Sequence, residues 1–380
     1  MKKILALILT VCIVSCAFIG CTGGGEASTG ANVEAQSWKI GFITSGSTDE
    51  GQALPQERAF RNAVEALNCE AVFVTIPENT APGVISSIES LLNQNCDGIV
   101  LINMVHMMGL TATVIDMCEA AGVYVSFFNT LIEEGTDAYE AAMESDYFVS
   151  SHYNDNAQAA YNATKALADM GITKICYYGH PDTNPTGKYR LEGVQKAVAD
   201  FGMELLTYNS DLALLYQPDG AATLAENLIT GFPDMEGVVL GVGAAVTPAF
   251  ELVAASVGRE IAISGIDFFA TQSSSMGEDG ILKYMTGGHV VGGAYAAIMM
   301  INKLNGTPLV DEGVFIEDYF LAAQNQEEAE VLDTCYFGVD LFTAEEIREH
   351  CIAFNPDATY EKFLEFIKGY SADQLMQKYQ

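Results

Sequence analysis

The chain of 380 residues carries little positive charge. It has 17 Lys and Arg against 50 Asp and Glu, which gives a formal net charge of -33 at pH 7. So acidic a surface repels polyanions, which argues against nucleic acids and anionic membrane surfaces as partners. Hydrophobic residues nevertheless make up 49% of the chain, which supports folded domains and argues against disorder.

Motifs for metal binding and catalysis are also missing. None of the nine cysteines has the C-x-x-C spacing of zinc or thiol-redox sites, and no Ser/His/Asp or paired-carboxylate arrangement occurs. Two segments approach nucleotide-binding loops, but Tyr189 replaces the Ser or Thr of a phosphate loop and Val246 is too bulky for a dinucleotide fingerprint. We therefore expect no enzyme, no metal and no cofactor.

The N-terminal segment is typical of an export signal. Lys2 and Lys3 precede an apolar run that ends at Ile19, shorter than the roughly 20 residues of a spanning helix. A Gly-rich segment follows Cys21, which favours a lipoprotein with a signal peptide at 1–20, lipid on Cys21 and a flexible tether at 21–37. Such a protein is held in the cell envelope, on the outer face of the cytoplasmic membrane. Attachment at Cys16, a plain secretory signal and a retained anchor are the alternatives.

The cysteines after the leader fall into two groups. Four lie in apolar, patterned segments and are predicted to be buried free thiols: Cys69, Cys96, Cys118 and Cys176. Cys335 and Cys351 lie in a later polar region, where a disulfide is an open alternative because sequence does not fix connectivity.

From Trp38 onward, short apolar runs alternate with amphipathic stretches, which predicts parallel sheets covered by helices on both faces. The predicted strands are 39–44, 71–76, 98–102, 123–128, 147–150, 174–178, 204–208, 237–240 and 261–266. The predicted helices are 56–67, 84–93, 110–121, 156–170, 189–201, 221–229 and 248–257. The length of the mature chain and this series predict two doubly wound lobes, followed by an acidic helical extension.

Several polar side chains come just beyond the carboxyl ends of these strands, where open α/β sheets bind ligands. They are Asp49, Asn103, Asn129, His180, Asp182 and Asp267. Carboxylates and amides suit the vicinal hydroxyls of a sugar, and an aromatic ring suits its C–H face. The structural alternatives are a helix cap for Asp267, a turn for Asn129 and a role in shaping the loop for His180.

Four short segments resemble the type I periplasmic binding proteins of ABC importers, in particular the galactose- and ribose-binding group. They are Phe127-Phe-Asn129, Phe148-Val-Ser-Ser-His-Tyr-Asn-Asp-Asn156, Gly179-His-Pro-Asp182 and Gly265-Ile-Asp267. The resemblance covers about residues 38–324. It implies two lobes joined by a three-segment hinge near 154–155, 286–288 and 314–318, with ligand captured between them by closure.

The resemblance also implies the domain bounds and the site. The N-terminal lobe is expected over 38–154 plus 287–316, the C-terminal lobe over 155–286 plus 317–324, and the helical extension over 325–380. The implied ligand-binding residues are Asp49, Asn103, Phe128, Asn129, His180, Asp182, Arg190, Tyr216 and Asp267. The implied partners are a sugar-like molecule and the transmembrane subunits of an ABC permease, which the protein serves as a monomer.

Departures from the family pattern concern the ligand. The sequence Gly241-Val-Gly-Ala-Ala-Val246 replaces polar residues, Thr286-Gly-Gly-His289 replaces an Asn or Gln, and the calcium loop of galactose-binding proteins is absent. The site is therefore expected to be drier and roomier than a hexose site. A nucleoside ligand and a sensory receptor for chemotaxis or signalling are the alternatives, and the export signal and acidity disfavour a DNA-binding repressor of the same architecture.

Overall fold

The structure, a computed structural model, describes residues 36–45, 53–78, 80–102, 109–211, 219–242, 246–267 and 273–379, without the side chains of residues 45 and 335–337. The predicted signal peptide and Cys21 lie outside the described residues. Two sheets organise the rest. The strands β3 (Gly98–Ile102) and β9 (Ala262–Ile266) are buried at every residue, because helices cover both faces of each sheet.

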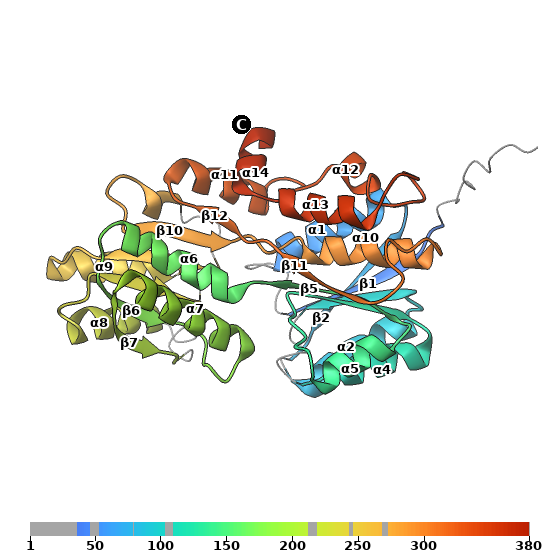
Figure 1. The fold of residues 1–380 in the computed structure, drawn as a ribbon, viewed down its shortest axis with the longest axis horizontal. Helices are drawn as coiled ribbons and strands as arrows, with labels where there is room; N and C mark the ends of the chain where they lie inside the picture. The colour runs from blue at the N-terminus through green and yellow to red at the C-terminus, as the bar shows by residue number, and fades with distance from the viewer. Residues whose placement is uncertain are drawn as a thin grey trace, which may run out of the picture. The chain divides into compact units, whose positions relative to one another are not determined.

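Sheet A, as far as the described residues show it, has six parallel strands in the order β11-β5-β4-β3-β1-β2. Besides β3, they are β1 (Lys39–Ser45), β2 (Glu70–Ile76), β4 (Tyr124–Phe128), β5 (Phe148–Asn154) and β11 (Val314–Asp318). One face is covered by α1 (Ala53–Ala66) and α10 (Gly292–Leu304). The other face carries α2 (Ala81–Asn93), α4 (Thr111–Ala121) and α5 (Asp137–Glu144), as Figure 1 shows.

Sheet B has the order β12-β10-β9-β8-β6-β7, and only β12 runs antiparallel, along β10, among its described strands. Besides β9, they are β6 (Lys174–Tyr178), β7 (Glu204–Asn209), β8 (Gly237–Leu240), β10 (Leu282–Gly287) and β12 (Leu321–Ala323). Its helices are α6 (Asn156–Asp169), α7 (Pro185–Phe201), α8 (Gly220–Gly231) and α9 (Thr247–Val257), with the short helix η3 (Ser273–Met276). Alternate strand residues face different helices: Tyr177 packs with α6 and α7, while Tyr178 packs with α8 and α9.

The prediction of two parallel-sheet lobes with a helical extension is therefore confirmed. The chain passes between the sheets after β5, after β10 and after β11. The third passage differs from the expectation, because residues 314–318 form β11 of sheet A and the chain leaves that sheet only after Asp318. A buried pair joins two of these strands: His152 Nδ1 lies 2.9 Å from Asp318 Oδ1, and Asn154 Nδ2 donates to the Asp318 carbonyl at 3.1 Å.

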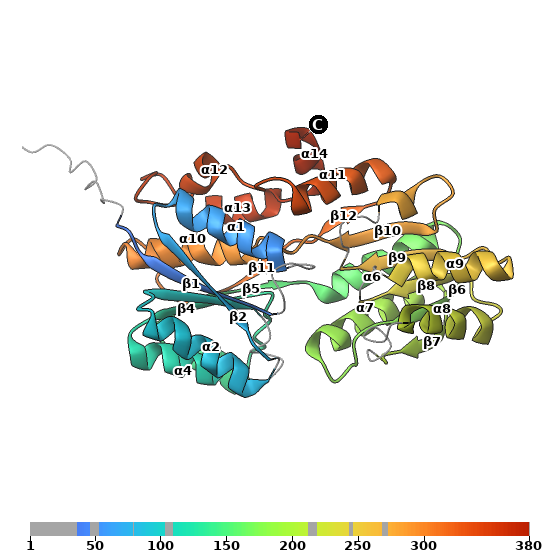
Figure 2. The same ribbon diagram turned by 180° about the vertical axis from the view of Figure 1, so that it is seen from behind.

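The C-terminal extension holds four helices within the described residues: α11 (Gln326–Phe337), α12 (Ala344–Arg348), α13 (Tyr360–Gly369) and α14 (Ala372–Tyr379). Thr343 caps α12 in a capping box with Glu346, and the Thr359 side chain caps α13. Figure 2 shows that these helices run along the same side as α1 and α10. In the described part of the chain, no helix is both long and apolar enough to cross a bilayer.

The cysteine predictions can be compared with the structure. Cys69, Cys96, Cys118 and Cys176 are buried and free, as expected. Burial raises the pKa of the Cys118 thiol to about 12, so it is protonated and inert. Cys351 is also buried and free, while the side chain of Cys335 is not described.

Candidate functional site

Arg190 and Asp267 form the centre of the candidate site. Arg190 lies in the second turn of α7, which begins at Pro185 behind the N-cap Asn184. Asp267 directly follows β9 and adopts a φ of 61°, a left-handed conformation that a short polar residue tolerates. Both side chains therefore lie where the strands of sheet B end, the edge at which doubly wound sheets bind ligands.

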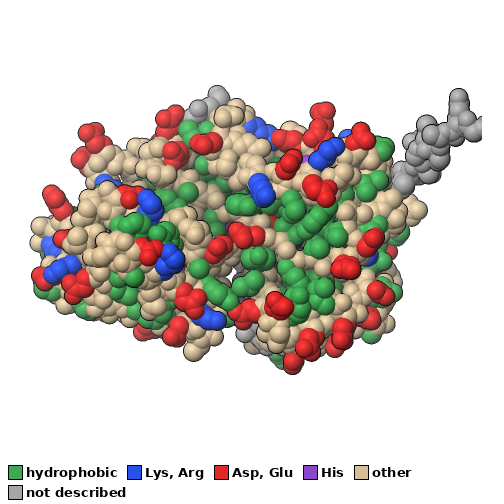
Figure 3. Space-filling model, viewed as in Figure 1, with side chains coloured by type: hydrophobic (Ala, Val, Ile, Leu, Met, Phe, Trp, Pro, Cys, Tyr) green, Lys and Arg blue, Asp and Glu red, His purple; other side chains and the backbone are tan. Residues whose placement is uncertain are grey.

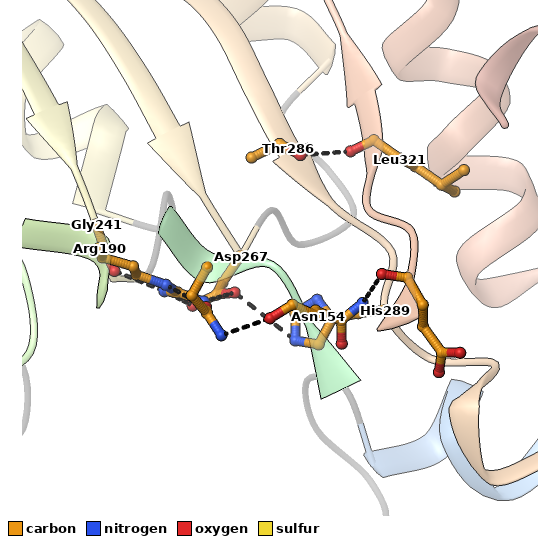
Figure 4. A network of polar contacts seen from close by, with 9 residues as sticks. Asn154, Arg190, Gly241, Asp267, Thr286, His289 and Leu321 are labelled. Atoms are coloured by element: carbon orange, nitrogen blue, oxygen red, sulfur yellow. Dashed lines mark hydrogen bonds and ion pairs between the residues drawn. The ribbon is translucent and has the colours of Figure 1, made fainter. Parts of the chain in front are cut away.

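The two side chains form a bidentate ion pair (Figure 4). Arg190 Nη1 lies 2.5 Å from Asp267 Oδ2, and Nη2 lies 2.9 Å from Oδ1. The guanidinium also donates through Nε to Asn156 Oδ1 at 2.8 Å and through Nη1 to the Gly241 carbonyl at 2.6 Å. Only 3% of the Arg190 side chain is exposed, so this one residue connects the start of α6 with the ends of β8 and β9.

The cluster around this pair has no net charge at neutral pH. Burial raises the pKa of Asp267, but the charge and hydrogen bonds of Arg190, with His289 and His180, outweigh it and lower this pKa to about 2. Burial, reinforced for both rings by the Arg190 charge, lowers the pKa of His180 and of His289 to about 4. Both imidazoles are therefore neutral, and His289 Nε2 lies 3.7 Å from Asp267 Oδ1.

Three polar atoms near the strand ends are buried without a hydrogen-bond partner among the described residues: Asn129 Oδ1, His180 Nδ1 and His289 Nδ1. An unpaired buried polar atom costs about 1–3 kcal/mol. A ligand hydroxyl is both donor and acceptor, so it can pair with any of the three. The backbone holds two of these residues in place. Asn129 adopts a φ of 51° directly after β4, and the His180 carbonyl accepts a hydrogen bond from Tyr208 Oη at 2.6 Å.

One contact joins the loop after β4 to the start of α7. Tyr189 Oη donates to Glu133 Oε1, and Lys188 Nζ lies 3.8 Å from the same oxygen. The hydrogen bond to Glu133, with burial, raises the pKa of Tyr189 to about 12. A loop that follows a sheet A strand thus contacts a helix of sheet B close to Arg190.

The structure brings only part of the predicted site together. Arg190 and Asp267 pair directly, and the charges of both act on His180. Asp182 is exposed on the loop after β6. Four predicted positions lie outside the described residues: Asp49, Asn103, Tyr216 and the lipidation residue Cys21.

Phe128 does not match its prediction. Its side chain is 0% exposed and its ring stacks on Phe42, with centroids 5.1 Å apart, in the core beneath sheet A. Phe128 is still part of strand β4, as its last residue. A strand side chain points toward a face of the sheet, where helices cover it, and not beyond the strand end where a ligand would bind.

His289 and Asn156 belong to the cluster but were not among the predicted site residues. His289 is a lone histidine beside two glycines, in a segment that replaces an Asn or Gln of the family pattern. Asn156 begins α6 and looks like part of an ordinary helix start. Their role depends on Arg190 and Asp267, which are 77 residues apart and whose pairing no local pattern indicates.

The described residues contain no cluster of three or more His, Cys, Asp or Glu side chains arranged to hold a metal ion. What the arrangement offers is a neutral set of hydrogen-bonding groups at the ends of parallel strands. Together with two doubly wound sheets and three crossings, it defines a bilobal ligand-binding protein.

The chain belongs to the periplasmic binding protein domain family, whose model matches residues 40–308. The fold is that of a type I periplasmic binding protein. A periplasmic sugar-binding protein from Pseudomonas fluorescens is 14% identical, with a TM-score of 0.69 over 89% of this chain and 99% of that one.

Two further structures are similar to this chain. A periplasmic solute-binding protein of an ABC transporter from Actinobacillus succinogenes, with bound D-allose, has 14% identity, a TM-score of 0.65 and coverage of 77% and 99%. An ABC transporter solute-binding protein from Bacillus halodurans, with bound myo-inositol, has 16% identity, a TM-score of 0.63 and coverage of 79% and 99%. No curated protein is similar enough to match the sequence.

Proposed function

We propose that this protein is an extracytoplasmic solute-binding lipoprotein that captures a small, uncharged, sugar-like ligand between its lobes and delivers it to an ABC permease. The neutral Arg190–Asp267 pair is the observation that carries the proposal. Four of the five N–H groups of the Arg190 guanidinium already donate to protein oxygens. The guanidinium can therefore donate few hydrogen bonds to an anionic ligand.

The surface charge points the same way. Acidic side chains outnumber basic ones on the face that Figure 3 shows, in line with the net charge of -33. Such a field lowers the local concentration of anions and leaves neutral solutes unaffected. Sugar phosphates and sugar acids are therefore disfavoured, and neutral sugars and polyols are favoured.

The relatives support this ligand class. The two described above with bound ligand hold D-allose and myo-inositol, both neutral and polyhydroxylated. In this chain the unpaired atoms of Asn129, His180 and His289 would accept or donate to such hydroxyls, and Asp267 would accept from them. Closure would be stabilised only if ligand contacts came from both lobes, which Asn129 on one side and Asp267 on the other would provide.

Isothermal titration with a panel of neutral sugars and polyols, beginning with D-allose and myo-inositol, tests the proposal. We expect Asn129→Ala and Asp267→Ala each to weaken binding about tenfold or more. Asp234→Ala is the matched control, since it removes an exposed carboxylate paired with Lys174 at the other end of sheet B. Unchanged affinity in both site variants contradicts the assignment.

The lipid anchor needs its own experiment. Metabolic labelling with an alkyne fatty acid should label the wild-type protein and the Cys16→Ala variant but not Cys21→Ala. Label that persists in Cys21→Ala and disappears in Cys16→Ala would assign the attachment site to Cys16. No label in the wild type refutes the lipoprotein.

A further inference from the structure

The C-terminal extension contacts the helices that cover sheet A. Asn62 Nδ2 of α1 donates to the Phe342 carbonyl at 2.5 Å, and Asn302 Nδ2 of α10 donates to the His350 carbonyl at 2.9 Å. The extension also packs on the other lobe, where α11 lies against η3 and β12. It lies beyond the residues matched by the family model, so membership of the family assigns it no role.

Tyr370 connects this extension to a crossing between the sheets. It follows α13, only 2% of it is exposed, and its ring centroid lies 6.0 Å from that of Phe342. Its hydroxyl donates to the carbonyl oxygen of Gly288 at 2.8 Å. Gly288 belongs to the segment between β10 and α10, so the extension holds the backbone of that crossing directly.

The crossing has little freedom at this point. Gly288 has a φ of 70°, and a Cβ built on it would lie 2.7 Å from Leu321 Cδ1. Thr286 Oγ1 donates to the Leu321 carbonyl at 2.7 Å. The segment between β10 and α10 therefore packs against β12 on one side, and the Gly288 carbonyl of this segment accepts a hydrogen bond from Tyr370.

His289 is the next residue, and its position follows from that of Gly288. The imidazole lies edge-on to Phe320, with centroids 5.0 Å apart, and its Nε2 approaches Asp267. Figure 4 shows His289 beside Asp267 in the same network as Arg190. A shift of the Gly288 peptide would move this ring relative to the carboxylate.

We propose that Tyr370 is a positioning residue of the ligand site: by holding the Gly288 carbonyl it keeps the His289 imidazole beside Asp267. The extension then contributes to ligand binding, because it fixes the His289 imidazole before ligand binds and so avoids the entropy cost of ordering this ring on binding. The effect on ligand affinity rests on the proposed function, whereas the position of His289 does not.

The test compares Tyr370→Phe, which keeps the ring and loses the hydroxyl, with Tyr379→Phe. The control loses a hydroxyl-to-carbonyl hydrogen bond, to Asp340, within the same extension and away from the crossing. Imidazole NMR signals are recorded across pH for both, with His289 assigned by His289→Gln. In the wild type, burial and the Arg190 charge hold the His289 pKa at about 4 against the opposing effect of Asp267.

We expect Tyr370→Phe alone to shift the His289 signals and to move its midpoint away from the wild-type value of about 4, because the ring changes its distance from Asp267 and Arg190. The affinity for the best neutral polyol of the panel should fall about three- to tenfold in this variant and stay unchanged in Tyr379→Phe. His289 signals identical to wild type in Tyr370→Phe overturn the proposal. If His289 shifts and no polyol binds any variant, the positioning role stands and the proposed ligand class is wrong.

Discussion

Removing the carboxylate of Asp267 should strongly destabilise the protein. The Asp267→Ala variant leaves a guanidinium that is 3% exposed with hydrogen bonds to Asn156 and Gly241 but no counter-charge. Breaking a buried ion pair in this way typically costs 3–5 kcal/mol, and we expect about 3 kcal/mol because two neutral acceptors remain.

The pH dependence gives a second, smaller value for the contribution of the Asp267 carboxylate to the free energy of unfolding. The folded-state pKa of Asp267 is about 2, below its ordinary value of 3.8, so the unfolded chain takes up this proton first as pH falls. The stabilisation is complete above about pH 4 and is lost as pH falls through 2; a difference of just under two pKa units corresponds to roughly 2–3 kcal/mol. The alanine variant should lose more than this, because protonation leaves a hydrogen-bonding carboxylic acid beside Arg190 and truncation leaves nothing.

Urea unfolding at pH 7, followed by far-UV circular dichroism, measures the loss. The comparison is with Arg190→Met/Asp267→Ala, which also removes the unpaired guanidinium, keeps the same residue at the φ of 61° and should recover part of the stability. The reasoning is refuted if Asp267→Ala costs less than about 1 kcal/mol, or if the double variant is no more stable than the single one.

Three further changes probe other parts of the molecule. Gly288→Ala should cost roughly 1–3 kcal/mol in urea unfolding, because the added Cβ meets Leu321 at a φ of 70°; a neutral effect contradicts the described crossing. Burial, with Lys362, lowers the pKa of His350 to about 4, so stability should fall between pH 6.5 and 4, and His350→Gln should remove up to roughly 3 kcal/mol of that loss; equal pH profiles speak against it. Thr343→Ala removes the capping box of α12 and should cost about 1 kcal/mol, whereas Thr334→Ala, whose hydroxyl donates within α11, serves as the control.

The central strands were predictable because their sequence carries a simple signal. Residues 98–102, 174–178 and 237–240 are short runs of mostly apolar residues, and each is a largely buried strand with those bounds. The helix α10 was missed for the opposite reason. It is buried on all sides, between sheet A and the C-terminal aromatic rings, so it lacks the polar face that marks a surface helix.

The helix α5 was missed because it is short and weakly buried. Among its residues only Ala142 is buried, so a pattern based on apolar spacing has little to detect. The resemblance implies a crossing at 314–318, where the structure has strand β11, because sequence cannot show that the chain returns to pair with β5. Both errors arise from tertiary context rather than from local propensity.

The candidate site was predictable only as a set of positions. The structure has Asn129 just after strand β4 of sheet A, and His180 and Asp267 just after strands β6 and β9 of sheet B, the strand ends that the sequence indicates. The bidentate pairing of Arg190 with Asp267 was not predictable, since it depends on the packing of α7 against the ends of β8 and β9. This pairing changes the chemistry, because it turns two charges into one neutral unit.

The central claim is that this protein captures a neutral, polyhydroxylated solute, and native mass spectrometry tests it most directly. The protein is incubated with an equimolar mixture of neutral sugars, polyols, nucleosides and sugar phosphates, exchanged into volatile buffer and weighed. We predict one neutral sugar or polyol bound per chain, retained by Asp234→Ala and lost from Asn129→Ala. Retention of only a nucleoside or a sugar phosphate, or no complex with any compound, contradicts the account.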